Sequence, residues 1–241
     1  MNSKNNIQVA FSPELFEYYN CTDSITVIVD IFRATSSICT AFENGVKEII
    51  PTPNLDEARK LKEKGYIVAA ERDGKVLDFA DFGNSPFNFT PERVKGKSVA
   101  YSTTNGTKAI LKANESKMVI ISSFINITAT ANLISRNNFD VIILCAGWKG
   151  NFCLEDSIFA GALAEKLLDT ELFSTNCDSA KASLDLWRHA KADIIGYIDK
   201  TAQRQRLAKL GLDDILEYCF TPDSSNVVPF YHKGTIEAYN L

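Results

Sequence analysis

The sequence has few of the side chains that bind soft metals. Its 241 residues contain two histidines and six cysteines, and the cysteines are scattered without a CxxC pair. This scarcity excludes a histidine-rich metal centre and argues against a zinc site or a disulfide framework, so we expect six free thiols. Any bound metal is therefore expected to have oxygen ligands, as Mg²⁺ and Mn²⁺ do.

Long apolar runs and an excess of positive charge are also absent. No apolar run approaches the roughly 20 residues that a membrane span requires. Residues 1–6 lack the apolar core of a signal peptide, which favours a cytoplasmic location. The net charge of −4 argues against a nucleic-acid partner, because such proteins usually carry a basic face. With 45% hydrophobic and 23% charged residues, the chain has the composition of an ordinary globular protein.

Short strands rich in Val and Ile alternate with helical patterns in the first part of the chain. Strands are predicted at 25–30, 47–50, 66–71, 98–103, 117–122 and 140–146. This alternation predicts an α/β fold with a layered αβα architecture and a mainly parallel or mixed sheet. Residues 1–170 are expected to form the α/β portion. Residues 171–241 are expected to form a helical and loop-rich segment, helical over 178–211, that packs on it in one compact unit as a lobe or as a cap.

Five of the predicted strands end in polar residues or glycine. These ends are Asp30, Glu71, Ser102–Thr104, Ser122–Ser123 and Ala146–Gly147. Because the carboxyl ends of parallel strands line the ligand crevice of an open α/β sheet, we expect these residues to converge on one site.

The first of these strand ends combines a carboxylate with an arginine. Asp30 closes a buried apolar strand, and Arg33 follows with the hydroxyls of Thr35 and Ser36 at a predicted helix start. A carboxylate can hold a metal, and an arginine beside a helix start can hold an anion. The segment therefore indicates a site for a phosphate or another anionic oxygen acid. The simpler alternative makes Asp30 a helix cap and Arg33 its salt-bridge partner on the surface.

The segment Thr103–Thr107 is a second candidate for anion binding. It follows a strand and opens a helix, and Gly106 permits a tight turn that leaves backbone amides free. Thr103, Thr104, Asn105 and Thr107 add side-chain donors. The alternative is an ordinary Asn-Gly turn with a threonine cap.

Two adjacent acids, Glu155 and Asp156, begin the helix that follows the strand at 140–146. Acids in a first helical turn ordinarily complement the helix dipole. If they face the crevice, either of them together with Asp30 supplies the two carboxylates that Mg²⁺ typically takes. Cys153 lies beside these acids, which raise the pKa of a thiol, so we expect it to be a poor nucleophile.

Taken together and in order, these segments resemble the 2-phosphosulfolactate phosphatase family of the coenzyme M pathway. The likeness runs from about residue 7 to residue 236. The segments that carry it are Asp30–Thr35, Ala70–Arg72, Gly83–Pro86, Thr103–Thr107, Ser123–Asn126, Cys145–Gly147, Glu155–Asp156, Arg206–Leu207, Leu210–Gly211, Asp213–Asp214 and Val228–Pro229.

The resemblance implies a Mg²⁺-dependent phosphatase that hydrolyses 2-phosphosulfolactate to sulfolactate and phosphate. The implied catalytic residues are Asp30, Arg33, Glu155 and Asp156, and the implied metal ligands are Asp30, Glu71, Glu155 and Asp156. The implied substrate-binding residues are Arg33, Thr35, Ser36, Arg72, Asn84, Ser85, Thr103, Thr104, Asn105, Gly106, Thr107, Asn126 and Lys149.

Three questions stay open at the level of sequence. The substrate can be a different small phosphorylated hydroxy acid, and a non-catalytic anion-binding protein would share the anion site. The sequence does not decide between a phospho-enzyme and direct attack by water, although Asp30 is not followed by the Asp-x-Asp pattern of common phosphatases. A homodimer is the default for an enzyme of this size.

Overall fold

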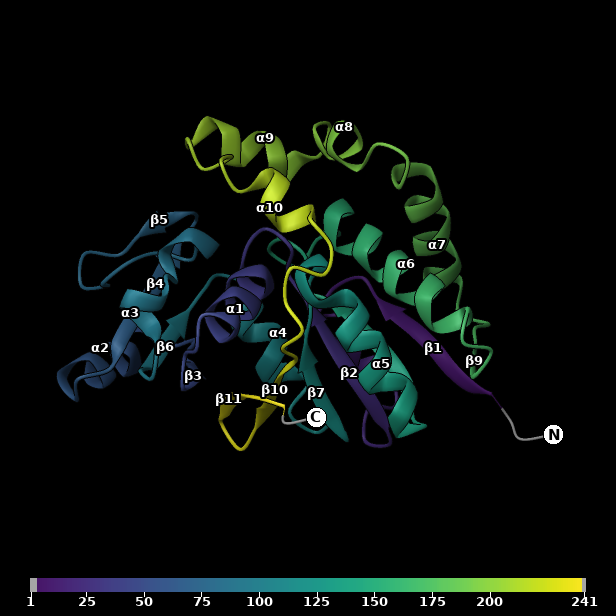
Figure 1. Cartoon of the computed structure of the whole chain (residues 1–241), viewed down its shortest axis with the longest axis horizontal. Helices are drawn as coiled ribbons and strands as arrows, with labels where there is room; N and C mark the ends of the chain where they lie inside the picture. The colour runs from purple at the N-terminus through teal and green to yellow at the C-terminus, as the bar shows by residue number, and fades with distance from the viewer. Residues whose placement is uncertain (1–3, 240–241) are drawn as a thin grey trace.

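The computed structural model describes residues 4–239 as three layers, with a central sheet between two sets of helices (Figure 1). The strands are β1 (Asn5–Ala10), β2 (Ser24–Val29), β3 (Glu48–Pro51), β4 (Ile67–Arg72), β5 (Lys75–Val76), β6 (Ser98–Ser102), β7 (Met118–Ile121), β8 (Asp140–Cys145), β9 (Phe173–Ser174), β10 (Pro229–His232) and β11 (Thr235–Ala238). The helices are α1 (Ala34–Glu43), α2 (Leu55–Glu63), α3 (Pro91–Val94), α4 (Gly106–Lys112), α5 (Ile127–Asn137), α6 (Leu154–Leu168), α7 (Asp178–Ala190), α8 (Ile194–Ile198), α9 (Ala202–Lys209) and α10 (Leu216–Phe220). Short 3-10 turns are η1 (Phe16–Tyr18), η2 (Pro86–Asn88) and η3 (Phe124–Asn126).

The sheet consists of two parallel blocks joined by a hairpin. Its order is β5-β4-β6-β3-β11-β10-β7-β2-β8-β1-β9. Strands β4, β6 and β3 are parallel to one another, and so are β7, β2, β8, β1 and β9. Hairpin β10–β11 lies between the blocks and pairs antiparallel with β7 on one side and β3 on the other. The sheet is therefore mixed and mostly parallel, as the sequence predicted.

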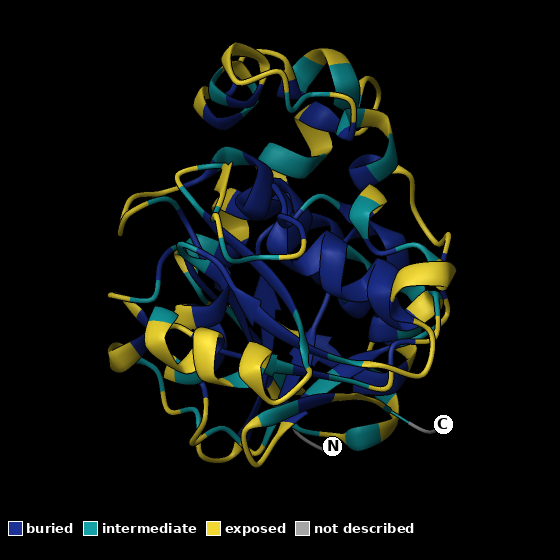
Figure 2. Ribbon diagram, turned by 90° about the vertical axis from the view of Figure 1, so that its left-hand side faces the viewer, coloured by how far each residue is buried: buried dark blue, intermediate teal, exposed yellow. Residues whose placement is uncertain are grey.

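Strand β2 shows why both faces of the sheet are covered. All six of its residues are buried, and alternate side chains enter different cores. Ile25 and Val27 pack with helices α5, α6 and α7, whereas Ile28 packs with α1 and α4. This period-two alternation is the ordinary geometry of a strand covered on both sides. The layered αβα prediction is confirmed, and Figure 2 shows the buried strands inside a shell of partly exposed helices.

The segment after residue 170 contributes strands as well as helices. Its hairpin β10–β11 occupies the middle of the sheet, and β9 extends one edge. The sequence pattern missed these strands, together with β1 and β5. β5 and β9 have two residues each, and β10 and β11 have four, whereas β1 has six and lies inside the sheet. In Figure 1, helices α8, α9 and α10 lie at the top of the view, above α1 and the ends of the strands.

Local sequence patterns located six strands and the start of helix α2. The six predicted strands correspond to β2, β3, β4, β6, β7 and β8. Asn54 caps α2 by accepting a hydrogen bond from the amide of Asp56 at 2.8 Å, as a cap residue should. The expected helix over 178–211 is divided into α7, α8 and α9. Among residues 4–239, no helix has both the length and the apolarity needed to span a bilayer.

Candidate active site

The loops that follow β2, β4, β6 and β8 meet in one place. Gly106, after β6, approaches the end of β2 so closely that an added Cβ would lie 3.0 Å from Oδ2 of Asp30. The backbone amide of Lys149, after β8, donates to Oδ1 of Asn105 at 3.2 Å. Nζ of Lys149 also lies 2.9 Å from Oδ1 of Asp73, which follows β4. The strand ends of both parallel blocks therefore form a single site, although the hairpin between the blocks gives them opposite directions in the sheet.

Three buried carboxylates form the centre of this site. Asp30, Glu155 and Asp156 are 9%, 2% and 3% exposed. Burial raises the pKa of Asp30 to about 6 and that of Glu155 to about 7, and each group is affected by its acidic neighbours. Burial, Glu155 and Asp30 raise the pKa of Asp156 well above its ordinary value. Such concentrated negative charge in a low-dielectric environment is costly unless a cation or a proton compensates it.

Asp156 is held by the backbone on both sides of the site. Its Oδ1 accepts from the amide of Ile31 at 2.9 Å, and its Oδ2 accepts from the amide of Gly147 at 3.1 Å. This carboxylate therefore links the end of β2 to the end of β8. Its position at the head of α6 places Glu155 beside it, facing a cleft described below.

Glu71 organises the rim of the site. Its Oε1 accepts from the amide and the hydroxyl of Thr104, at 2.9 and 3.1 Å, and its Oε2 accepts from the amide of Gly74 at 2.7 Å. The carboxylate thus fastens the turn after β4 to the loop after β6. Its negative charge is also one of the influences that raise the pKa of Asp30.

Arg33 is a buried cation without a protein counterion. Its residue is 5% exposed. Within residues 4–239, no hydrogen bond reaches its guanidinium group and no carboxylate lies within 4.0 Å of it. The surface salt bridge considered from the sequence is therefore wrong, because the residue is buried and unpaired. Buried arginines are ordinarily paired, so this arrangement indicates an anionic ligand.

The starts of helices α1 and α4 face each other across Asp30. The amide of Ala34 donates to Oδ1 of Asp30 at 3.3 Å. Asp30 therefore caps helix α1, as one sequence interpretation suggested, and also belongs to the acid cluster. An added Cβ at Gly106 would lie 2.5 Å from the Cβ of Ala34, which explains why glycine is needed where the helices meet. Both helix starts point their positive dipole ends toward the carboxylate.

Several predicted substrate-binding side chains are instead used to build the local backbone. The hydroxyls of Thr35 and Ser36 donate to the carbonyls of Asp30 and Ile31, both at 3.0 Å. The hydroxyl of Thr107 donates to the carbonyl of Thr103, also at 3.0 Å. These bonds hold the turn that carries Asp30 and the loop at residues 103–107.

Asn84 has a different environment. It is 6% exposed, and its Oδ1 is buried without a hydrogen-bond partner in the described part of the chain. Its backbone carbonyl accepts from the hydroxyl of Ser37 in α1, which holds the residue near the start of that helix. A buried acceptor without a partner is rare and indicates a missing donor.

Four other predicted residues lie around the site in different ways. Arg72 donates to the Ser102 hydroxyl at 3.0 Å and to two backbone carbonyls, which braces β4 against β6. Ser85 is half-buried at the start of η2, and within residues 4–239 no hydrogen bond joins it to the acids. Lys149 is exposed and forms the ion pair with Asp73 described above.

The fourth of these residues, Asn126, uses its side chain for hydrogen bonds that join two segments of the chain. Its Oδ1 accepts from the amide of Ser123 at 3.0 Å, and its Nδ2 donates to the carbonyl of Val227 at 3.0 Å. The amide is fully buried and fastens η3 to the segment before β10. The end of β7 consequently does not join the other four strand ends through any hydrogen bond to the acid cluster among residues 4–239.

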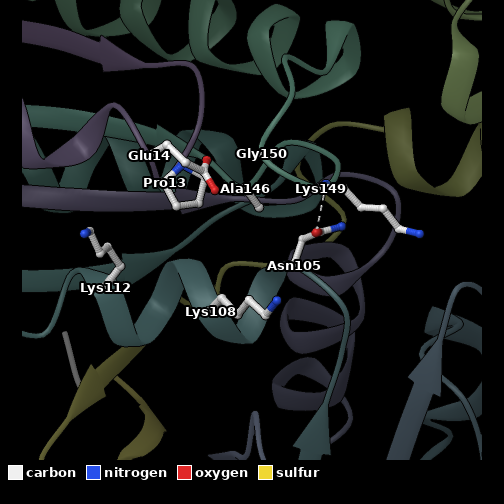
Figure 3. A pocket seen from close by; sticks show the side chains of 8 residues that line it. All are labelled: Pro13, Glu14, Asn105, Lys108, Lys112, Ala146, Lys149 and Gly150. Atoms are coloured by element: carbon white, nitrogen blue, oxygen red, sulfur yellow. Dashed lines mark hydrogen bonds between the residues drawn. The ribbon is translucent and has the colours of Figure 1, made fainter.

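Two hollows border the site. One, of about 380 Å³, is lined by Trp148, Glu155, Gln203 and Arg206 together with neighbouring residues of α9 and the loop before α6. The other, of about 250 Å³, is shown in Figure 3, where the dashed line joins Asn105 to Lys149. Lys108 and Lys112 of α4 also line it. Lys108 lies near Asn105, and Lys112 lies farther along the helix.

Arg206 is a site residue to which the sequence reasoning gave no role. Its guanidinium stacks over the ring of Trp148, 4.0 Å from the centroid, and donates to the carbonyl of Asp73 at 3.3 Å. Partial burial lowers its pKa, while the charges of Glu71, Asp73 and Asp30 oppose that change. It comes from α9, far along the chain, and no periodicity indicates that α9 covers the strand ends.

The acid cluster has the composition that magnesium requires, without being a closed protein cage. Among residues 4–239, no group of three or more His, Cys, Asp or Glu side chains is arranged as a metal site. Mg²⁺, however, usually takes one or two carboxylates and fills its remaining positions with water and phosphate oxygens. Asp156 and Glu71 already accept backbone hydrogen bonds with both oxygens. Asp30 and Glu155 are therefore the carboxylates best suited to such a metal.

The cysteines are all free, as expected. Burial, followed by the charges of Asp156 and Glu155, raises the pKa of Cys153. A thiol with a raised pKa is rarely deprotonated and is a poor nucleophile. His189 and His232 are both exposed and lie away from the site.

Comparison with known proteins agrees with this geometry. The model of the 2-phosphosulpholactate phosphatase family matches residues 10–234. A probable 2-phosphosulfolactate phosphatase of Caldanaerobacter subterraneus is 36% identical over 214 residues, which is 87% of this chain and 88% of that protein. Proteins described in the same words are 35% identical in Clostridium beijerinckii, over 89% of this chain and 91% of that protein, and 36% identical in Clostridium acetobutylicum, over 87% and 90%. The chain therefore belongs to the 2-phosphosulfolactate phosphatase family.

Proposed function

We propose that this protein hydrolyses 2-phosphosulfolactate to sulfolactate and inorganic phosphate in a reaction that requires Mg²⁺. The observation that carries the proposal is the buried, unpaired Arg33 beside three buried carboxylates of raised pKa. A lone cation requires an anion, and clustered carboxylates require a cation. A phosphate ester together with a magnesium ion satisfies both requirements. The names of the family and of the relatives supply the particular substrate.

Each residue has a role that follows from its contacts. Arg33 binds the phosphoryl oxygens. The amides of Thr104 and Thr107, next to the start of α4, already donate to Glu71 and Thr103. Asp30 and Glu155 hold the metal, which when bound neutralises phosphate charge and lowers the pKa of a bound water. Asp156 positions the peptide of Ile31 and thereby the carboxylate of Asp30. The unpaired Oδ1 of Asn84 can accept a hydrogen bond from a donor, such as the 2-hydroxyl that forms on sulfolactate when the ester is cleaved.

Direct attack by water fits these residues better than a phospho-enzyme. A phosphate monoester dianion resists attack mainly because it is negatively charged, so charge neutralisation and alignment supply most of the catalysis. The thiols take no part in this scheme.

The test is phosphate release from a panel of esters with and without Mg²⁺. The panel contains 2-phosphosulfolactate, 2-phospholactate and p-nitrophenyl phosphate, with excess chelator as the control for adventitious metal. The proposal expects turnover that is highest for 2-phosphosulfolactate and that is lost with chelator and restored by Mg²⁺. Equal or better turnover of 2-phospholactate would assign the enzyme to another hydroxy acid. Binding of these esters without turnover would indicate an anion-binding protein.

A further inference from the structure

We infer that the cleft between α9 and the loop after β8 is the subsite for the sulfonate group of the substrate, with Arg206 as its recognition residue. This inference rests on the proposed function and adds to it a specificity-determining residue. The substrate carries three anionic groups, a phosphate ester, a carboxylate and a sulfonate. Arg33 accounts for one of them.

Arg206 is held in a fixed orientation. Its Nε donates to Oε1 of Gln203 at 2.6 Å, and its Nη1 donates to the carbonyl of Asp73 at 3.3 Å. The guanidinium plane lies over the ring of Trp148, at 4.0 Å. Gln203 is itself buried, so one of these partners is rigid. An arginine fixed in this way loses little conformational entropy when it binds a ligand.

The remaining edge of the guanidinium is available. Within the described part of the chain, Nη2 of Arg206 has no hydrogen-bond partner, and no carboxylate lies within 4.0 Å of the group. The residue lines the 380 Å³ cleft together with Glu155. The cleft therefore has a carboxylate of the acid cluster at one wall and a cation with a free donor at another. A molecule whose phosphate lies at the acids can extend a second anionic group to Arg206.

The lining of the cleft suits a sulfonate more than a carboxylate. Trp148, Phe152 and Leu154 contribute apolar surface, and Lys200 lies against the ring of Tyr197 instead of pointing an unpaired charge into the cleft. A sulfonate is permanently ionised and weakly hydrated, as a guanidinium is, and it leaves water more readily than a carboxylate. Arginine in an apolar surrounding is the side chain that matches it.

The turn after β4 connects this subsite to the catalytic acids. Gly74 adopts a positive φ of +86°, and an added Cβ there would lie 2.9 Å from a methyl group of Leu210 in the segment after α9. The same turn is fixed to Glu71 by the bond from the Gly74 amide. Helix α9 is therefore fastened to the catalytic rim and does not merely lie above it.

The experiment compares two substrates in three variants. Arg206→Ala and Arg206→Lys are measured beside Lys209→Ala, which removes a charge from an exposed position of the same helix. The quantity is the ratio of kcat/KM for 2-phosphosulfolactate to that for 2-phospholactate. In Arg206→Ala the ratio is expected to fall about 10²-fold, since a charge-assisted contact is lost for one substrate only. Arg206→Lys recovers part of the ratio, and Lys209→Ala leaves it unchanged.

A binding measurement separates this inference from the proposed function. Calorimetry with sulfolactate, which needs no turnover, is expected to show binding to the wild type that weakens about 10- to 100-fold in Arg206→Ala. Equal losses of kcat/KM for both substrates, or unchanged sulfolactate binding, would overturn the subsite. If sulfolactate binds through Arg206 while 2-phosphosulfolactate is not hydrolysed, the proposed function is wrong and the subsite stands. Circular dichroism shows whether Arg206→Ala is folded, and Arg206→Lys gives the answer if it is not.

Discussion

The two ends of helix α6 place acidic residues in opposite circumstances. At its start, Glu155 and Asp156 are buried beside Asp30, and burial raises the pKa of each. Near its end, Glu165 is half-buried. It accepts from the indole of Trp187 at 2.7 Å and from Lys191, and Arg188 lies 3.7 Å away. Partial burial tends to raise the pKa of Glu165, but these donors and cations lower it below its ordinary value.

The difference distinguishes acids that stabilise the fold from acids kept for chemistry. Glu165 fastens α6 to α7 with every partner it needs, so its charge is compensated by the protein itself. Arg33 and Arg206 lower the pKa values of Asp30 and Glu155, respectively, but burial outweighs them and both values stay raised. Groups whose environments oppose their charge are common at functional sites because a ligand relieves the opposition. The predictions below test this contrast, from the largest expected effect to the smallest.

Replacing Asp30 by Asn is expected to have the largest effect. The amide keeps the shape but cannot hold a cation, so kcat should fall by about 10³-fold or more and the affinity for Mg²⁺ should weaken. Without ligands, the same change removes a buried negative charge from a repulsive cluster and should raise Tm by about 3–6 °C. Steady-state kinetics and calorimetry check both parts. Near-normal activity at limiting Mg²⁺ would contradict the assignment.

Arg33→Ala is expected to lower kcat/KM by about 10²- to 10³-fold, because a charge-assisted contact to a buried anion is lost. Arg33→Lys should restore little of this, since an ammonium group cannot reproduce a bidentate guanidinium contact. Kinetics with 2-phosphosulfolactate at saturating Mg²⁺ provide the measurement. Full activity in Arg33→Ala would remove this residue from the site.

The free energy of unfolding should fall as the pH rises, whereas a paired acid with a lowered pKa would make it rise. The pKa values of Asp30, at about 6, and of Glu155, at about 7, exceed the values of about 4 expected in the unfolded chain. The folded protein therefore binds more protons between pH 4 and 7, and its free energy of unfolding should fall as the pH rises through that interval. Mg²⁺ should reverse the trend near pH 7, because it binds the ionised carboxylates.

The control for this measurement is Asp30→Asn, in which the pH dependence should become shallower. Denaturant unfolding with chelator present, at pH 5 and at pH 7.5, provides the comparison. Greater stability at the higher pH in the absence of metal would show that the cluster is compensated by the protein and is not kept for a ligand.

Glu165→Gln should affect stability and leave catalysis unchanged. The loss of its ion pairs with Lys191 and Arg188 is expected to cost about 0.5–1 kcal/mol of unfolding free energy, since the pairs are partly exposed. Values of kcat and KM should stay within a factor of about two of the wild type. A large loss of activity would show that Glu165 contributes to catalysis as well as to stability.

The smallest effect is expected for Cys153→Ser. The thiol is buried and its pKa is raised, so it should contribute nothing as a nucleophile. The variant should keep most of its activity, and all six thiols should react after denaturation without a reductant. A phosphocysteine adduct detected by mass spectrometry would require a different mechanism.

The local pattern of the chain was sufficient to identify the core strands and their polar ends. Apolar runs such as Ile25–Val29 are buried on both faces, so their composition alone indicates a covered strand. Asp30 and Arg33 were found because they follow such a run, and Glu155 and Asp156 because they begin the helix after another one. Strands β10 and β11 were missed because a strand of four residues that is only partly buried has no distinctive pattern.

The sequence by itself determined the alternation of strands and helices, the free thiols and the residues at the strand ends, because these depend on neighbours within a few positions. Only the tertiary structure decided which of those residues share a site. The C-terminal hairpin separates the sheet into two blocks, and the contacts of Gly106 with Asp30 and of Lys149 with Asn105 show that their ends still meet. The structure also brought Arg206 to the site, and it showed that the side chain of Asn126 is bonded to Ser123 and Val227. Both outcomes depend on packing between segments distant in sequence, which local chemistry does not encode.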